Sequence, residues 1–355
     1  MSKKARTLAK IAAPVVGCAV LVGAGSLVSA GPFSSDGREL PTVDLQAALN
    51  VDQAIPGKAP ENVQPGNLVA IGDSIFIFAN PKVGDAALNL AASSNPDNQF
   101  LQRLVSTDPN INPRGCAQGT PSLPKEMAAQ LGVPLNDYSC AAATVYTPRP
   151  GNQLMDQVDH AIADGALNPG TKYVAIQGGY NDVYNNYQKL SGENLPDQAI
   201  AERLGTTTQK TDFERAIDPI VAKVKEHAPN ANIKFVGYHE ITEDRPGGWQ
   251  CLYHIGDGRG QDNKWDISYA FPVYWDTQGK INSNKWMQEA AQRHGVGYID
   301  TRTFSKGHGE CASPQDRWVG GVLLDNTTGD FNLSLHLTDQ GVNAIGGFAA
   351  NEFRK

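Results

Sequence analysis

The chain has 355 residues, of which 40% are hydrophobic and 19% are charged. These proportions predict a packed globular core and exclude a chain that is disordered throughout. The formal net charge is -7 at pH 7. An acidic chain of this kind argues against nucleic acid or anionic lipid as a partner, because both carry negative charge themselves.

The first thirty residues predict a secretory signal peptide. Residues 1–10 carry four basic side chains and no acid, an uncharged stretch of small apolar residues follows, and residues 28–30 read VSA. A basic start, an apolar middle and a small-residue end are typical of such peptides. Two alternatives stay open. The segment is nearly long enough to remain as a membrane anchor, and residues 16–18, VGC, resemble a lipoprotein-type cleavage site.

Residues 31–66 are rich in Gly, Pro, Asp and Asn, and we expect an extension that packs on the edge of the domain. From residue 67 onwards, short apolar runs alternate with amphipathic helical patterns. The apolar runs predict strands within residues 67–72, 133–140, 172–179, 232–238 and 296–300. The helical patterns cover residues 122–132, 152–165, 211–229, 281–295 and 338–353.

This alternation predicts βαβ units. We therefore expect an α/β fold, a three-layer α/β/α sandwich of the flavodoxin-like kind, with a central parallel sheet of about five strands. After residue 66 the amino-acid composition does not change and no internal repeat occurs, so residues 67–355 are expected to form one domain. In such sheets, ligands bind at the carboxyl ends of the strands.

Polar loops follow three of the predicted strands. The first strand ends in Gly72-Asp73-Ser74, and the third ends in residues 178–182, GGYND. A lone GDS turn and an Asn-Asp helix cap are both ordinary features. Placed on one sheet edge, however, the Asn181 amide could donate to an oxyanion formed beside Ser74. Residues 139–144, SCAAAT, are small enough to bring backbone N–H groups close to the same oxygen.

A serine nucleophile requires a base, and the late His336 is the best placed histidine. It stands just before the last predicted helix, where a loop can return to the active edge. His254 lies in a Gly-rich region with no obvious partner, and three others lie on helices or helix ends, where surface positions are expected. The full set is His160, His227, His239, His254, His294, His308 and His336.

Four cysteines follow the signal segment, an even number that predicts two disulfides in an exported protein. Three pairings are possible, and we favour pairing between sequence neighbours. A zinc site is disfavoured because no C-x-x-C spacing occurs. The cysteines are Cys116, Cys140, Cys251 and Cys311.

The order and placement of these motifs resemble the SGNH (GDSL-type) hydrolase family. Longer stretches are similar to its secreted actinobacterial lipase and esterase branch: CAQGTPSLPKEMAAQLG resembles the Cys-led stretch of that branch, and DYSCAAAT resembles its SCSGAT element. Residues 281–311 resemble its INxxxxxxAxxxGVxYVDxxxxFxGHxxC stretch, and SLHLTDQG resembles SFHPNxxG. The resemblance spans about residues 66–352.

The resemblance implies specific roles. Ser74 matches the nucleophile, whose backbone N–H also serves the oxyanion hole, and Asn181 matches the side-chain donor of that hole. His336 matches the general base, while His308 matches a position outside the catalytic set and is expected to be structural. The resemblance also supports the pairs Cys116–Cys140 and Cys251–Cys311, and it implies no metal or organic cofactor.

Two positions depart from the family pattern. Ala142 stands where a Gly usually supplies an oxyanion-hole N–H, which Ala retains if its backbone angles allow it. Leu333 stands three residues before His336, where the family usually has Asp. As in some members of the branch, we expect the Leu333 main-chain carbonyl to orient the imidazole, which gives a Ser–His dyad. Asp330 and Asp325 remain alternatives for that role.

We therefore expect a secreted, monomeric serine ester hydrolase, a lipase or esterase acting on small-molecule, lipid or acylated-sugar esters. The alternatives are an acyltransferase or a carbohydrate deacetylase of the cell envelope with the same site, and an inactive envelope binding protein. Residues 244–275 are rich in aromatics. They would form a small core of their own or line a trench for the substrate.

Overall fold

The computed structural model describes residues 63–77, 116, 118–191, 193, 196–243, 248–256, 265–321, 324–325, 327 and 335–355. The expected signal peptide lies outside these residues, as do nearly all of the extension at 31–66 and the positions Asp330 and Leu333. Among the described residues, no helix combines the length and the apolar character that a membrane span requires.

A five-stranded parallel sheet lies at the centre of the molecule. It has the order β2-β1-β3-β4-β7, and every neighbouring pair in it is parallel. Its strands are β1 (Leu68–Ile71), β2 (Leu135–Asp137), β3 (Tyr173–Ile176), β4 (Asn232–Val236) and β7 (Gly297–Ile299). All residues of β1 and β3 are buried, as expected for strands that are covered on both faces.

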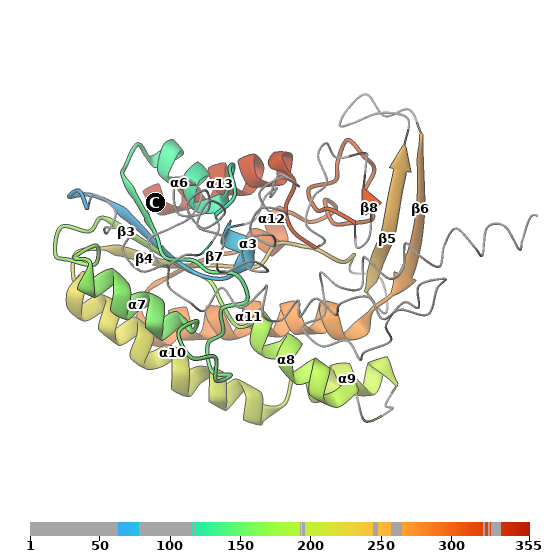
Figure 1. Ribbon diagram of the computed structural model, residues 1–355, viewed down its shortest axis with the longest axis horizontal. Helices are drawn as coiled ribbons and strands as arrows, with labels where there is room; N and C mark the ends of the chain where they lie inside the picture. The colour runs from blue at the N-terminus through green and yellow to red at the C-terminus, as the bar shows by residue number, and fades with distance from the viewer. Residues whose placement is uncertain are drawn as a thin grey trace, which may run out of the picture.

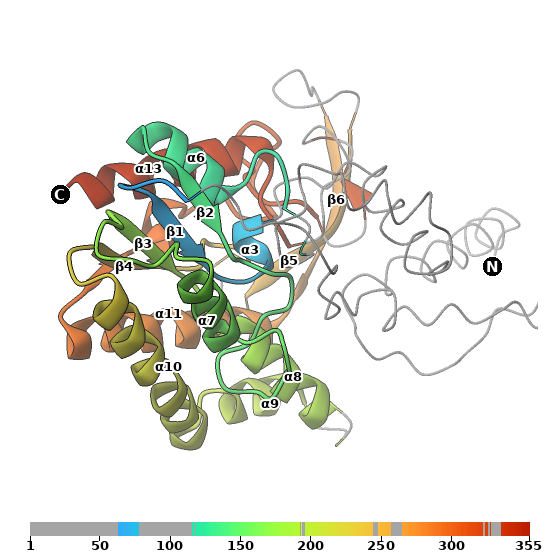
Figure 2. The ribbon, with the colours of Figure 1, turned by 60° about the vertical axis from the view of Figure 1, so that its left-hand side comes forward.

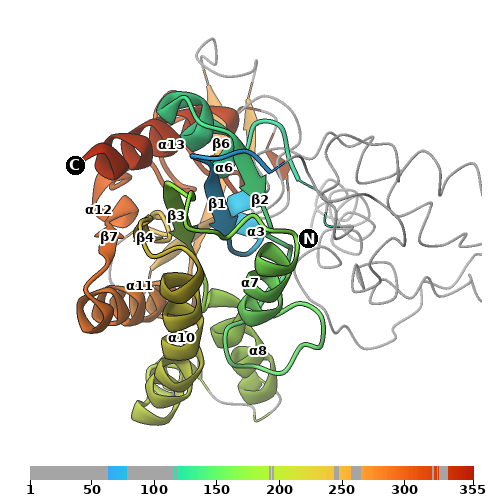
Figure 3. The ribbon, with the colours of Figure 1, turned by 90° about the vertical axis from the view of Figure 1, so that its left-hand side faces the viewer.

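Helices cover both faces of this sheet (Figure 1). Figure 3 shows α6 and α13 together on one side, with α7, α10 and α11 on the other. The bounds of the five are α6 (Leu123–Leu131), α7 (Leu154–Ala163), α10 (Thr207–His227), α11 (Tyr274–His294) and α13 (Asp339–Arg354). The predicted three-layer α/β/α sandwich is confirmed.

Local signals set some helix ends correctly and others incorrectly. Ser122 and Thr338, at which two of the predicted helical patterns begin, cap α6 and α13 through their side-chain oxygens. The helix predicted to begin at Thr211 begins four residues earlier, at the start of α10, and α11 begins at Tyr274 instead of residue 281. The first two turns of α11 carry the fully buried pair Asp276–Lys280. Because polar side chains at the start of α11 face the interior, this segment lacks the apolar stripe from which a helix is predicted.

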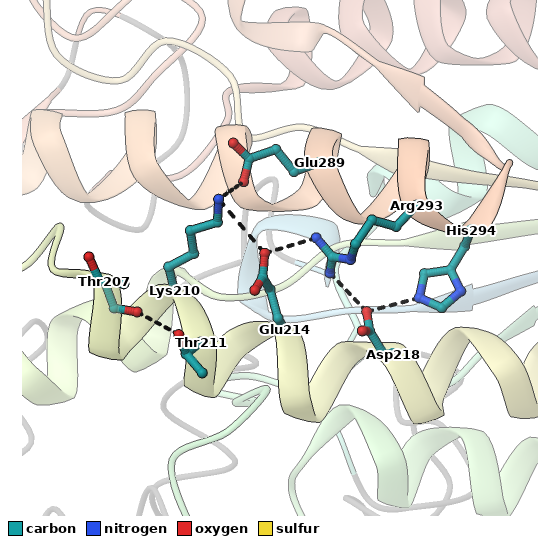
Figure 4. A network of polar contacts seen from close by, with 8 residues as sticks. All are labelled: Thr207, Lys210, Thr211, Glu214, Asp218, Glu289, Arg293 and His294. Carbon is teal, nitrogen blue, oxygen red and sulfur yellow. Dashed lines mark hydrogen bonds and ion pairs between the residues drawn. The ribbon is translucent and has the colours of Figure 1, made fainter.

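Helices α10 and α11 are also joined at their surface by a network of ion pairs (Figure 4). Arg293 of α11 contacts both Glu214 and Asp218 of α10, at 3.0 and 2.8 Å, and His294 lies 2.9 Å from Asp218. Lys210 contacts Glu289 at 2.7 Å. Exposed pairs of this kind contribute little individually, and they give His294 a structural role.

The aromatic segment forms a second sheet, which the sequence analysis did not predict. Strand β5 (Trp249–Gly256) pairs with β6 (Asp266–Pro272) as an antiparallel hairpin and with β8 (Leu324–Asp325) in parallel. The hairpin stands to the side of the main sheet (Figures 1 and 2). Trp265 and Tyr269 are exposed, while Trp275 stacks on Tyr187 with ring centroids 3.9 Å apart. The aromatics therefore do not form one separate core.

Both disulfides join the pairs favoured from the sequence, Cys116–Cys140 and Cys251–Cys311. The first ties residue 116 to the loop after β2. The second ties β5 to the segment after the short helix α12 (Thr301–Phe304). Each disulfide therefore attaches a polypeptide segment to the carboxyl side of the sheet.

Candidate active site

Ser74 is half-buried and is the first residue of the short helix α3 (Ser74–Ile77), which directly follows β1 (Figure 2). The turn before it is held at both backbone groups of Gly72: its N–H donates to Gln157 Oε1 at 2.8 Å, and its carbonyl accepts from Gln157 Nε2 at 2.9 Å. A Cβ at Gly72 would lie 2.7 Å from the Phe76 ring. The turn therefore requires Gly and presents Ser74 on a fixed backbone.

Asp73, which directly precedes Ser74, is buried and accepts hydrogen bonds from two groups. Its Oδ1 accepts the Ile75 N–H at 3.0 Å, and its Oδ2 accepts the Tyr238 hydroxyl at 2.5 Å. Burial raises the pKa of Asp73 from 3.8 to about 6, although both hydrogen bonds oppose the rise. The Asp of the GDS turn is thus a structural anchor, and its charge depends on pH.

Tyr238 connects the serine turn to the loop after β3. It lies two residues after β4, donates its hydroxyl to Asp73, and accepts the Tyr180 N–H on the same oxygen at 3.2 Å. Its backbone is held by the Asn284 amide in both directions, at 2.7 and 2.9 Å. Tyr238 was not predicted from the sequence. Its position at the carboxyl end of a predicted strand was the available signal.

Asn181 and Asp182 occupy the first turn of α8 (Tyr180–Ser191) and hold the loop after β2. Asn181 Nδ2 donates to the Ala143 carbonyl at 3.0 Å. The buried Asp182 carboxylate accepts the backbone N–H groups of residues 145, 146 and 147, at 2.8, 3.0 and 2.6 Å. Burial raises the pKa of Asp182 above its ordinary value, and these hydrogen bonds counteract the rise. Asn181 and Asp182 therefore hold the loop after β2 in place, whereas a helix cap would bond only within its own helix.

Ala142 has a φ of 59°, in the left-handed region that favours Gly. An L-residue pays about 1–2 kcal/mol for this conformation. The loop maintains it through Asn152 Nδ2, which donates to the Ala141 carbonyl at 2.8 Å, and through the Cys140 N–H, which donates to the Gly72 carbonyl at 3.0 Å. This position therefore requires a left-handed backbone conformation, and Ala142 adopts it at a cost in conformational energy.

His336 lies three residues before α13 and is half-buried. Its carbonyl accepts the Gly320 N–H at 2.9 Å, and the Thr338 N–H donates to the Trp318 carbonyl at 2.8 Å. This short pairing fixes the backbone of His336. Leu333 and Asp330 lie outside the described residues, and Asp325 belongs to β8, so the group that orients the imidazole stays a prediction.

Three other histidines have structural contacts. His308 stacks on Trp318 with ring centroids 3.7 Å apart. His227 Nδ1 lies 3.0 Å from the Lys223 carbonyl. The expectation that His254 lacks a partner was wrong, because it belongs to β5, and its ring nitrogens lie 2.8 Å from Asp266 and 2.6 Å from the Glu310 carbonyl.

Residues 70–344 match the family model described as the GDSL-like Lipase/Acylhydrolase family. The match covers well over half of the chain, so the chain belongs to this family and is a carboxylic ester hydrolase. No curated protein sequence matches the chain.

Similar solved structures include a phospholipase A1 from Streptomyces albidoflavus, with 17% identity, a TM-score of 0.47, and coverage of 81% of this chain and 99% of that chain. An extracellular lipase from Streptomyces rimosus has 17% identity, a TM-score of 0.48, and coverage of 81% and 98%. A carbohydrate acetylesterase from Sinorhizobium meliloti has 13% identity, a TM-score of 0.38, and coverage of 81% and 97%.

Among the described residues, no group of three or more His, Cys, Asp or Glu side chains is placed to hold a metal ion. A cavity of about 530 Å³ opens next to the loop that Asp182 anchors. Its walls come from that loop and from α7, α8 and α10, and they mix apolar with polar side chains. The lining residues are Val145, Tyr146, Thr147, Pro148, Gln153, Asn186, Asp212, Arg215 and Ala216.

Proposed function

We propose that the chain is a secreted serine ester hydrolase with Ser74 as nucleophile and His336 as general base. The observation that carries this proposal is the hydrogen-bonded connection from Asp73 through Tyr238 to Tyr180. It links the Ser74 turn to the loop of Asn181, so that the nucleophile and the side-chain oxyanion donor belong to one buried unit at the carboxyl edge of the sheet.

The reaction follows from these positions. Ser74 Oγ attacks the ester carbonyl carbon while its proton passes to His336, and the carbonyl oxygen becomes an oxyanion. His336 then gives that proton to the leaving alcohol as the tetrahedral intermediate collapses to an acyl-enzyme. Water attacks the acyl carbon, its proton passes through His336 back to Ser74, and the carboxylic acid leaves.

The oxyanion would receive the backbone N–H groups of Ser74 and Ala142 and the side-chain amide of Asn181. An amide NH₂ carries two hydrogens. The bond from Asn181 Nδ2 to the Ala143 carbonyl uses one of them and fixes the plane of the amide. The second hydrogen therefore has a defined direction before substrate arrives, which is what electrostatic preorganisation requires.

The two disulfides support a location outside the reducing cytosol. The signal peptide at residues 1–30 remains our prediction for the route, and a cleaved peptide, an anchor and a lipoprotein lead to different mature forms. Mass spectrometry of the mature N-terminus separates them. A first residue at position 31 supports the signal peptide, and an N-terminus that retains residues 1–30 contradicts it.

The second candidate is a carbohydrate deacetylase, supported by the mixed polar and apolar lining of the cavity beside the loop after β2, although Ser74, Asn181 and His336 are not among its lining residues. Asn186, Asp212 and Arg215 offer hydrogen-bonding groups beside Tyr146 and Pro148, a combination suited to a sugar ring. A series of nitrophenyl esters of increasing acyl length discriminates the two functions. Preference for acetyl supports the deacetylase, and preference for long acyl chains supports a lipase.

A fluorophosphonate probe tests the proposed nucleophile. We expect stoichiometric labelling of Ser74 in the folded protein and none in Ser74→Ala. Ser313→Ala serves as the matched control, because Ser313 lies on a surface turn and hydrogen-bonds Asp316. Absence of label on folded wild-type protein would refute the hydrolase mechanism.

A further inference from the structure

Tyr180, the residue before the proposed oxyanion donor Asn181, is held at both of its ends. Its N–H donates to the Tyr238 hydroxyl at 3.2 Å, and its own hydroxyl donates to the Asp276 carboxylate. Burial and the charge of Asp276 raise the pKa of Tyr180 well above its ordinary value, so the phenol keeps its proton and remains a donor. The first bond is part of the connection to Asp73, and the second leads to a different cluster of buried charges.

The Asp276 carboxylate is fully buried and joins three elements of the fold. Besides the Tyr180 hydroxyl of α8, it accepts Lys280 Nζ of its own helix α11 at 2.5 Å and Gln250 Nε2 of β5 at 2.9 Å. Lys280 Nζ also lies 4.5 Å from the centroid of the Tyr180 ring, close enough for a cation–π attraction. The ring and the hydroxyl of Tyr180 therefore contact the two members of one buried ion pair.

Helices α8 and α11 approach each other closely at this ion pair. A Cβ added to Gly279, the residue before Lys280, would lie 2.7 Å from Cγ1 of Val183 in α8 and 3.7 Å from the Tyr180 ring. A few residues earlier in α11, Trp275 stacks on the Tyr187 ring of α8. Because the two helices pack without space for one further methyl group, the hydrogen bond to Asp276 transmits the position of α11 to the first turn of α8.

An ion pair in the interior is a costly way to fasten two helices. Taking both charges out of water is unfavourable, and apolar side chains of similar volume often stabilise a fold equally well or better. What the pair adds is direction, because a carboxylate accepts a phenol hydroxyl only within a limited range of distances and angles, whereas apolar attraction is non-directional. Fixed orientation is what the neighbouring residue Asn181 requires as an oxyanion donor.

Building on the function proposed above, we propose that Asp276 is a positioning residue for the oxyanion hole. Lys280 and Gln250 both bind its Oδ2, which leaves Oδ1 directed at the Tyr180 hydroxyl. Asp276 thereby fixes Tyr180, and the peptide bond that joins Tyr180 to Asn181 carries this restraint to the Asn181 amide. Lys280 neutralises the buried charge of Asp276, and no proton is transferred within the cluster.

A double-mutant cycle between Tyr180→Phe and Asn181→Ala tests whether Tyr180 acts through Asn181. Removing an oxyanion donor costs about 10²–10³ in kcat, so we expect that loss from Asn181→Ala and about tenfold from Tyr180→Phe, which only loosens the donor. KM should change little. In the Asn181→Ala background, Tyr180→Phe should lower kcat by less than about twofold, because the group that it positions is already absent. Independent losses that multiply would overturn the proposal.

Tyr138→Phe is the matched control for Tyr180→Phe. It also removes a hydrogen bond from a phenol to a carboxylate, in this case to Asp164 at the end of α7, at 3.0 Å. Both Tyr→Phe variants should lower the midpoint of thermal unfolding, but only Tyr180→Phe should lower kcat. An equal loss of kcat in the two variants would contradict the proposal, since it would follow from lost stability alone.

Two charge-free versions of the ion pair provide the second test. Asp276→Asn combined with Lys280→Gln keeps an oxygen that accepts the Tyr180 hydroxyl and should retain most of kcat. Asp276→Ala combined with Lys280→Met lacks that acceptor and should lower kcat about tenfold. Changing both members together avoids the uncompensated buried charge that a single substitution leaves. The proposal fails if the two double variants have the same kcat.

Folding and labelling separate the remaining outcomes. If Tyr180→Phe and the variant with Asp276→Ala and Lys280→Met both fail to fold, the cluster serves the fold alone and the proposal is rejected. The fluorophosphonate probe is applied to wild-type protein in parallel. Folded wild type without label on Ser74 refutes the proposed function, whereas labelled wild type with independent losses in the cycle refutes only the role of Asp276.

Discussion

The nucleophile side of the site and the histidine side are held by different means. On the nucleophile side, Asp73 and Asp182 receive four backbone N–H groups and the Tyr238 hydroxyl between them. On the histidine side, the buried His239 has no hydrogen-bond partner among the described residues, and it lies near Lys280 and Arg302. Carboxylates therefore fix the loops of Ser74 and Asn181 before substrate binds, whereas on the His336 side the described residues include a buried imidazole that they leave without a hydrogen bond.

This difference suits the chemistry of each half. An oxyanion hole works best when its donors are rigid and already oriented. A general base must accept and release a proton in each half-reaction, so its surroundings have to tolerate both the neutral and the charged imidazole. Substitutions on the nucleophile side test how much its rigidity matters.

Ser74→Ala should have the largest effect. Removing the nucleophile should lower kcat by at least about 10⁴-fold, since the remaining groups cannot form an acyl-enzyme. Steady-state hydrolysis of a nitrophenyl ester measures this, with Ser313→Ala as control. The residual activity would show how much the oxyanion side achieves alone, and a mild loss would mean that another group attacks the ester.

Tyr238→Phe should have the second largest effect, because it removes the hydroxyl that joins Asp73 to the Tyr180 N–H. Asp73 loses a donor and the Tyr180 N–H loses its acceptor, and each unpaired buried group costs about 1–3 kcal/mol. We expect a lower midpoint of thermal unfolding and a fall in kcat of about tenfold. Tyr173→Phe, in β3 and packed on Phe353, is the control. Equal behaviour of the two variants would show that the hydroxyl bridge is not important.

Asp73→Asn should reveal the raised pKa of that carboxyl. Its value of about 6 in the folded protein exceeds the ordinary 3.8, so the folded state holds this proton more tightly than the unfolded chain. The stability that Asp73 contributes is therefore present at low pH and is lost as pH rises through about 6. Relative to the wild type, the melting temperature of the variant should rise between pH 4.5 and pH 7.5. Parallel curves would argue against a raised pKa.

Ala142→Gly should have the smallest effect. Gly adopts the left-handed conformation freely, but it also increases the entropy of the unfolded chain, so we expect a net gain of at most about 1 kcal/mol. Chemical denaturation measures it, and kcat should stay close to wild type. Ala143→Gly, at the neighbouring buried position without positive φ, should be destabilising. A loss of stability in Ala142→Gly would show that the strain is not released.

The sequence predicted the serine turn and missed its supports, for a physical reason. Gly72, Asp73 and Ser74 are consecutive, and their placement after an apolar run is a local property. Their supports come from far along the chain: Gln157 is 85 residues from Gly72, and Tyr238 is 165 residues from Asp73. Without knowing which strands are neighbours, no pattern in the sequence assigns these partners.

The amino-acid sequence by itself determined the alternation of strands and helices and the three-layer architecture, and it favoured the cysteine pairing that the structure confirms. Periodicity and spacing are properties of short segments, and a small set of rules restricts how βαβ units arrange their strands.

Only the tertiary structure decided the second sheet, the Tyr238 bridge, the strained Ala142 and the burial of His239. Each of these depends on which distant segments pack together, and on how much water their contact excludes from a polar group.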